Sequence, residues 1–153
     1  MRRRTTRALL LAGGLLLAGC SLFGTDESGA DRLVGPTWRL TSLQPPDGDT
    51  RPAEALVGRP DTSAAYTLEF RNDDQLGGVA DCNQYGGDYV ARDDGSLSVG
   101  SLAVTQKYCG EASREPLYLE GLAEAARYEV DDGALRIYFD GEGVLRFERG
   151  ADS

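Results

Sequence analysis

The chain has 153 residues, enough for one compact domain, and 25 acidic against 16 basic side chains give it a formal net charge of −9. This charge repels nucleic acid, so we do not expect binding to DNA or RNA. The sequence contains no histidine. That absence removes the usual general base, the Ser-His and Cys-His nucleophile pairs, and most zinc and copper sites.

Residues 1–19 have the features of a secretion signal. Arginines at positions 2, 3, 4 and 7 precede the apolar run from Ala8 to Leu17. That run of about ten residues is shorter than the roughly 20 needed to span a bilayer. We therefore expect a signal peptide that is removed from the mature protein.

The segment Leu17-Ala18-Gly19-Cys20 resembles a bacterial lipobox. The resemblance implies that Cys20 becomes the mature N-terminus and carries lipid, and several acyl chains hold a protein stably on a membrane. An ordinary signal peptide that happens to contain a cysteine is the alternative. Ser21 follows where an Asp would mark inner-membrane retention, so similarity to lipoproteins favours the outer membrane, facing the periplasm. Residues 20–33 are then the lipidated end and a flexible tether, and residues 34–150 the domain.

Two cysteines remain in the body of the chain, Cys82 and Cys109. In an oxidising envelope compartment they are most simply a disulfide, and two free thiols are the alternative. A bridge would close a loop of about 27 residues and stabilise the domain by roughly 3–4 kcal/mol.

Apolar residues alternate with polar ones in several short stretches, which is strand periodicity. In the first strand, Trp38 and Leu40 are expected to face inward, and strict alternation would place Ser42 on the same face. A long polar loop, residues 44–64, follows and is interrupted by prolines. The remaining strands are expected at residues 65–70, 76–80, 85–91, 96–99, 126–130, 134–139 and 144–148, and residues 102–105 are expected as a short extended piece towards Cys109.

One helix is expected after Cys109. Ser113 can cap it, Glu115 lies in its first turn, and Leu119, Leu122 and Ala126 form an apolar stripe. With six to eight short strands and one α-helix, the fold class is α+β, mainly an antiparallel β-sheet or partial barrel.

A glycine-rich stretch, residues 77–89, contains the candidate site residues. Its glycines provide either positive φ or close approach of another segment. Asn83 beside Cys82 is expected to hold a bend by bonding to nearby backbone, with contact to a ligand or partner as the alternative. Tyr85 and Tyr89 are interpreted as core or bend packing, or as a partner contact.

Acidic pairs occur at residues 73–74, 93–94 and 131–132, with Asp140 and Glu142 near the end. Paired carboxylates suit a glycosidase or a calcium site. Each pair lies where a hairpin turn is predicted, however, and Asp is favoured in turns for local hydrogen bonding. We therefore predict no metal site, no cofactor and no catalytic residue.

The order of these signals resembles the META domain family, bacterial envelope lipoproteins related to the heat-shock protein HslJ. The resemblance covers about residues 33–149. It is carried by Gly-x-x-x-Cys-Asn-x-Tyr-x-Gly-x-Tyr at residues 78–89 and Thr-x-x-x-Cys at residues 105–109. Gln106-Lys107-Tyr108 departs from the basic residue and methionine of many members, and the 44–64 insert is longer than expected.

The resemblance implies a β-rich domain with no established enzyme activity and a loose association with envelope stress. The expected function is a non-enzymatic envelope lipoprotein, anchored by its lipid, that binds an unknown envelope protein or supports stress tolerance. One alternative is a protease inhibitor that acts through loop 44–64. A calcium binder or carboxylate enzyme that uses Asp131 and Asp140 is another.

Overall fold

A computed structural model of the chain describes residues 28–56, 58 and 66–150. The predicted signal peptide, the lipidation site Cys20 and the first part of the predicted tether lie outside these residues. Within them, no helix is long and apolar enough to cross a membrane.

The described residues form short strands, two 3₁₀ turns and a single α-helix. The strands are β1 (Thr37–Gln44), β2 (Arg51–Pro52), β3 (Tyr66–Phe70), β4 (Gln75–Ala80), β5 (Asn83–Ala91), β6 (Leu97–Val99), β7 (Ala103–Val104), β8 (Ala125–Asp131), β9 (Ala134–Phe139) and β10 (Gly143–Arg149). The helical elements are η1 (Asp31–Leu33), η2 (Ala53–Ala55) and α1 (Glu115–Ala123).

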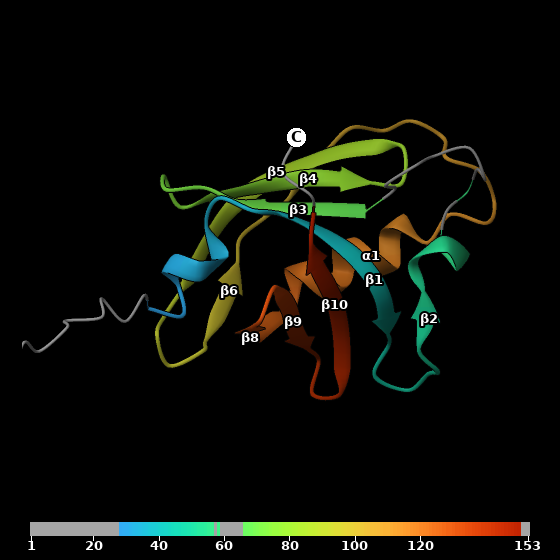
Figure 1. Cartoon of the computed structure of the whole chain (residues 1–153). Coiled ribbons are helices and arrows are strands. Elements are labelled where there is room, and N and C mark those ends of the chain that lie inside the picture. Colours follow the sequence, from blue (N-terminus) through green and yellow to red (C-terminus); the bar gives the residue numbers. More distant parts are fainter. Residues whose placement is uncertain (1–27, 57, 59–65, 151–153) are drawn as a thin grey trace, which may run out of the picture.

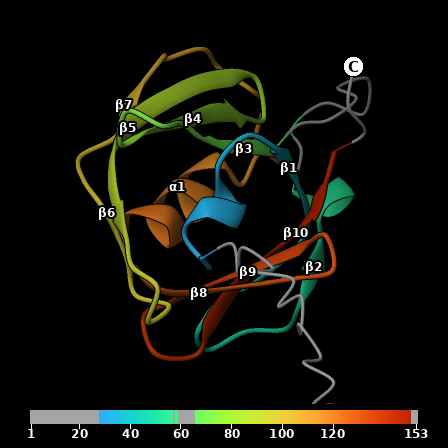
Figure 2. The same ribbon diagram turned by 60° about the vertical axis from the view of Figure 1, so that its left-hand side comes forward.

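The strands form an antiparallel, nearly closed barrel. Their order along the sheet is β6-β5-β4-β3-β1-β10-β9-β8, with β2 added beside β1 and β7 beside β5. A single bridge between Ser96 and Arg127 joins the two ends of this path. Seen along the barrel, the strands surround α1 (Figures 1 and 2). The predicted α+β class, a partial barrel with one helix, is confirmed.

Strand β1 follows the predicted alternation only for its first half. Trp38 and Leu40 are buried, but a register shift between Leu40 and Ser42 interrupts the pairing with β10. A bulge of this kind adds one residue to one strand and reverses which residues face inward beyond it. Leu43 is consequently fully buried, where strict alternation predicted Ser42.

The packed domain begins before residue 34, earlier than the sequence predicted. Leu33, which we assigned to the tether, is fully buried at the end of η1. Its carbonyl oxygen accepts a hydrogen bond from the indole N–H of Trp38 at 3.0 Å. The burial of two large side chains outweighs the turn-forming composition of the preceding residues.

The first half of the predicted loop 44–64 has local structure. Strand β2 pairs with Ser42 and Leu43 of β1, and η2 leads to the fully buried Leu56. Leu56 anchors the segment, because its carbonyl oxygen accepts hydrogen bonds from the Tyr66 hydroxyl and the main-chain N–H of Arg114. Residues 57 and 59–65 lie outside the described residues.

Helix α1 ends sooner than its predicted stripe. It stops at Ala123, and Ala126 is an exposed residue of β8. The buried face of the helix consists of Tyr118, Gly121 and Leu122, while Leu119 is only half-buried. Pairing of β8 with β9 begins at Ala125, so strand pairing takes over the residues that continue the helical pattern.

The predicted acidic turns are hairpin turns in the structure. Asp74, Asp132 and Asp140 have φ values of 59°, 40° and 39°, and Asp is among the non-glycine residues that adopt this region most readily. Asp94 accepts a hydrogen bond from the N–H of Ser96, two residues later, at 2.9 Å. These aspartates therefore shape the connections between strands.

The glycines of β4 and β5 provide close approach and not positive φ. A Cβ atom on Gly78 would lie 2.0 Å from the carbonyl oxygen of Thr67 in β3 and 3.0 Å from the Tyr85 hydroxyl. Gly78 is paired with Tyr85 across the two strands, so its missing side chain makes room for the tyrosine ring.

Replacing Gly78 by Ala is therefore expected to destabilise the domain by about 1–3 kcal/mol or more, because the colliding atom belongs to the backbone and cannot rotate away. Gly86→Ala is the matched control, since its nearest neighbour would lie at 3.4 Å. Urea unfolding of both purified variants measures the difference. Equal stability of the two would contradict the close-approach explanation.

Candidate functional site: the clamped segment beside the helix

The conspicuous site is built around residues 105–109, which connect β7 to the turn before α1. We refer to these residues as the clamped segment. Strands β4 and β5 are joined by a tight turn, Asp81-Cys82, because Ala80 pairs directly with Asn83. Asp81 adopts a φ of 54°, as such short hairpin turns require. The turn places Cys82 and Asn83 against the clamped segment.

The predicted disulfide is present. Cys82 and Cys109 are joined, their Cα atoms lie 5.5 Å apart, and the bond closes a sequence separation of 27 residues. Cys109 is buried, with 4% of its surface exposed. The bond fixes the end of the clamped segment to the β4–β5 turn, so neither sulfur is available as a thiol nucleophile in this form.

Asn83 holds the middle of the clamped segment. Its side-chain oxygen accepts hydrogen bonds from the Thr105 hydroxyl and the main-chain N–H of Lys107, both at 2.8 Å. Its amide nitrogen donates to the carbonyl oxygen of Lys107 at 3.0 Å and to the carboxylate of Glu115 at 2.8 Å. The buried amide thereby uses both acceptor and both donor positions within the fold. Its partners are distant in sequence, not the neighbouring backbone we expected.

Two acidic residues of this site were not identified from the sequence. Glu115 is the first residue of α1, and its N–H donates to the Ser113 hydroxyl at 3.3 Å. The N-cap position itself is occupied by Arg114, where the sequence predicted Ser113. Asp81 is 3% exposed, and its Oδ2 accepts the Gly58 N–H at 2.7 Å. Its Oδ1 has no hydrogen-bond partner among the described residues. The requirement for positive φ in a tight turn was the one available signal for Asp81.

Tyr85 and Tyr89 point into the barrel from the same face of β5 as Asn83. The Tyr85 hydroxyl contacts that of Tyr118 at 2.8 Å, and it donates to the Thr67 carbonyl oxygen at 2.7 Å. Tyr89 packs edge-on against Phe70, with ring centroids 4.8 Å apart, and its hydroxyl donates to the Arg71 carbonyl oxygen. Both side chains are buried, which places them in the core and not on a contact surface.

Tyr66, Tyr85 and Tyr118 form a buried cluster whose phenols are hard to ionise. Burial is the main cause in each case: it raises the pKa of Tyr66 to about 12 and lifts the pKa values of Tyr85 and Tyr118 well above their ordinary range. The charge of Asp81 adds to the effect at Tyr66. Near neutral pH these phenols remain protonated and hold the core through hydrogen bonds.

A hollow of about 510 Å³ lies between the clamped segment and the start of α1. Its apolar lining includes Val104, Pro116 and Leu119. Tyr108 lies at its border and is 73% exposed, which makes it the most exposed large apolar side chain among the described residues. The sequence signal for this residue was its departure from the methionine pattern of the family it resembles.

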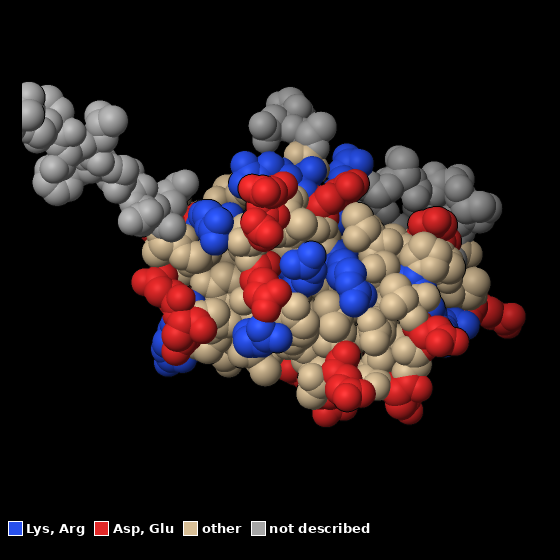
Figure 3. Space-filling model, turned by 60° about the horizontal axis from the view of Figure 1, so that its bottom comes forward, with Lys and Arg blue, Asp and Glu red and all other residues tan. Residues whose placement is uncertain are grey.

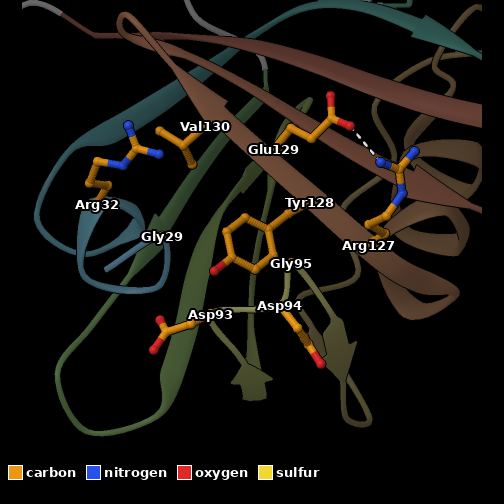
Figure 4. A pocket seen from close by; sticks show the side chains of 9 residues that line it. All are labelled: Gly29, Arg32, Asp93, Asp94, Gly95, Arg127, Tyr128, Glu129 and Val130. Carbon is orange, nitrogen blue, oxygen red and sulfur yellow. Dashed lines mark hydrogen bonds and ion pairs between the residues drawn. The ribbon is translucent and has the colours of Figure 1, made fainter. Parts of the chain in front are cut away.

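A second hollow, of about 370 Å³, marks the seam where β6 meets β8 (Figure 4). Tyr128 lies in it. Its N–H donates to the carbonyl oxygen of Gly95 at 2.8 Å, and its hydroxyl donates to the carbonyl oxygen of Arg92 at 2.9 Å. Arg127 is paired with Glu129. Arg32 also lines the hollow, and Figure 4 shows that the side chains of Asp93 and Asp94 approach neither Arg32 nor Arg127. We interpret this hollow as the closure of the barrel.

The surface offers mixed charge. Figure 3 shows blue and red side chains interspersed over the face it presents, without one continuous basic area. On β8 and β9 the guanidinium of Arg127 lies 3.9 Å from the ring centre of Tyr138, whose hydroxyl donates to Glu129.

Within the described part of the chain, no group of three or more acidic or cysteine side chains is placed to hold a metal ion.

The sequence pattern of the META domain matches residues 31–152. No curated protein sequence matches the chain. Several solved structures share its fold, among them the following two. An NMR structure of a protein from Burkholderia xenovorans is 22% identical, with a TM-score of 0.65 over 98% of this chain and 99% of that one. A crystal structure of a DUF4847 family protein from Bacteroides vulgatus is 16% identical, with a TM-score of 0.59 over 82% of this chain and 100% of that one.

The disulfide is expected to stabilise the domain as one unit. Cys82→Ser and Cys109→Ser should each lower the free energy of unfolding by roughly 3–4 kcal/mol, and the double variant by little more, because each change removes the same bond. Chemical denaturation of the three variants and the unchanged protein tests this. Additive losses would show that the two cysteines act independently in solution.

The tyrosine cluster predicts a loss of stability in alkali. The folded pKa values lie above the value of 10.0 for an ordinary phenol, so the neutral phenols stabilise the fold fully below about pH 10. That contribution falls as the pH rises through the folded values, with Tyr66 titrating at about 12. Denaturation measured at increasing pH should show the decline, and Tyr85→Phe should make it shallower. A flat profile would contradict the buried cluster.

Proposed function

Because this chain belongs to the META domain family, we propose that it is a non-enzymatic binding module of the bacterial cell envelope that acts through a protein partner. Lipid on Cys20 anchors it in the outer membrane, where the domain faces the periplasm and supports the envelope under stress. The observation that carries the proposal is Tyr108, 73% exposed on a segment fixed by Asn83 and the disulfide.

A large exposed aromatic on a fixed backbone suits protein recognition. Tyrosine is enriched among the residues that contribute most to interfaces, because it buries a large area and has few rotatable bonds. The clamped segment is ordered before any partner arrives, since Asn83 and the disulfide hold it. Less conformational entropy is then lost on binding.

The polar groups of the site support a binding role over catalysis. The Asn83 amide is occupied on both its oxygen and its nitrogen, and the buried phenols contact one another or carbonyl oxygens. General acid–base catalysis works best with a group whose pKa lies near the working pH, and the raised pKa values of Tyr85 and Tyr118 lie far above it. The acidic pairs serve hairpin turns.

Two features support the envelope location. The N-terminal sequence has the order of a charged region, an apolar run and a lipobox-like ending. The Cys82–Cys109 disulfide is of the kind that persists in an oxidising compartment such as the periplasm. Export from the cytoplasm by a signal peptide would account for both observations.

Protease inhibition through loop 44–64 is the second candidate. Strand β2 holds Arg51 and Pro52 extended and exposed beside β1, which is the presentation that an inhibitor offers to a protease. An adduct with a protease, formed from residue 51, would favour this function.

Photo-crosslinking from residue 108 tests the proposed function. A photoreactive phenylalanine analogue at Tyr108, in the lipidated protein in its own envelope, is expected to form a defined adduct with one protein. The matched control places the same analogue at Val90, the other exposed large apolar residue among those described, at 52% exposure. Position 90 should give no such adduct.

Mass spectrometry of the adduct identifies the partner, and Tyr108→Ser should reduce its co-purification with the domain. Equal adducts from positions 90 and 108, or none from 108 while residue 51 crosslinks strongly, would overturn the assignment of the binding surface. A turnover reaction that continues unchanged in the Tyr108→Ser protein would overturn the non-enzymatic role.

A further inference from the structure

We propose that the hollow beside Tyr108 binds an extended segment of the partner protein, which adds as a further strand to the outer edge of residues 104–108. This inference rests on the proposed function, because it specifies how the partner is recognised. The segment carries one large apolar side chain for the hollow and a net positive charge.

Among the described residues, no strand lies beside this edge of the barrel wall. Strands β6 and β7 pair with different parts of β5, and the sheet order ends there. The far end of the sheet, β8, meets β6 at the bridge between Ser96 and Arg127 and through the hydrogen bonds of Tyr128 to Gly95 and Arg92. Beside β7 and the clamped segment, the described residues supply no further strand, and the first turns of α1 form the opposite wall of the hollow.

The hydrogen bonds show which way the main chain faces. The N–H of Thr105 donates to the Gln84 carbonyl oxygen at 3.0 Å, and the N–H and C=O of Lys107 both bond to Asn83. Successive residues of an extended chain direct these groups to opposite sides. The main-chain N–H and C=O groups of Val104, Gln106 and Tyr108 therefore point away from β5. Within the described residues, the main chains of Gln106 and Tyr108 make no hydrogen bond.

Such an edge is complementary to an extended polypeptide. Strand addition provides main-chain hydrogen bonds for affinity and a side-chain pocket for specificity. Here the pocket is the hollow, whose volume of about 510 Å³ falls within the usual range for small binding pockets, about 300–1,000 Å³. Natural proteins protect free edges with charged side chains, prolines or bulges. Residues 104–108 contain no proline, and Lys107 is the one charged side chain among them.

Charge narrows the class of partner segment. The chain has a formal net charge of −9, and Glu115 lines the hollow while Glu111 is exposed just beyond the clamped segment. Lys107 also lines the hollow, and it is the single lysine of the chain, so the attraction comes from the net negative charge of the whole chain. A segment with basic residues flanking its apolar anchor is therefore attracted, and an acidic segment is repelled.

The experiment uses random short peptides displayed on phage, selected against the purified soluble domain with Cys20→Ser. The tightest binder is synthesised, and its main-chain nitrogens are methylated one at a time. Methylation should weaken binding by about tenfold or more at every second position and little between them, because alternate N–H groups face the domain. Hydrogen exchange at Gln106 and Tyr108 should slow when the peptide binds.

Gln106→Pro removes the outward N–H and should weaken binding by about tenfold or more, while Gln106→Ala, which keeps it, should bind normally. Thermal unfolding of both proteins verifies that they fold. Should the proline variant fail to fold, Leu119→Asp replaces it, because a carboxylate in the hollow should also abolish binding of the apolar anchor.

Several outcomes would overturn the inference. These are methylation effects without alternation, peptide protection at β8 and not at Gln106, a preference for acidic peptides, or pairing of two domains through this edge without peptide. If residue 108 still crosslinks a partner in the envelope while no peptide binds here, the proposed function stands and strand addition fails. If neither is seen, both fail.

Discussion

The buried amide of Asn83 is the contact on which the arrangement of the site depends. It joins the β4–β5 turn to the clamped segment and to the start of α1, whose contacting residues lie 24 and 32 residues further along the chain. An unsatisfied buried amide would cost roughly 1–3 kcal/mol for each lost partner, so the three parts are held in one relative position. The disulfide repeats the same connection with a covalent bond one residue away.

The core beneath this site is also partly polar. The hydroxyls of Tyr85 and Tyr118 both lie within hydrogen-bond distance of the Thr67 carbonyl oxygen, and Gly78 leaves room for the Tyr85 ring. Directional hydrogen bonds specify one packing arrangement more narrowly than aliphatic contacts do. The helix is consequently fixed inside the barrel even though its buried face is short. A fixed helix in turn gives the hollow beside Tyr108 a firm wall.

The sequence predicted the strands, the helix and the disulfide because each leaves a local or compositional signal. Alternation, turn residues and a cysteine count are all readable along the chain. It did not predict the bulge after Leu40, the early end of α1 or the burial of Leu33. Each of these follows from pairing or packing with residues far away. For the same reason Asn83 was expected to bond locally, and Glu115, 32 residues from it, was missed.

The pairing of the first strand with the last has a consequence for biogenesis. Strand β1 lies between β3 and β10, and the Thr41 hydroxyl bonds to the Arg146 carbonyl oxygen across 105 residues of chain. The barrel cannot close until its last strand has emerged, whether from a ribosome or from an export channel. Contacts of such long range slow folding. A chain built this way stays open, and able to be threaded through a channel, until nearly its whole length has been delivered.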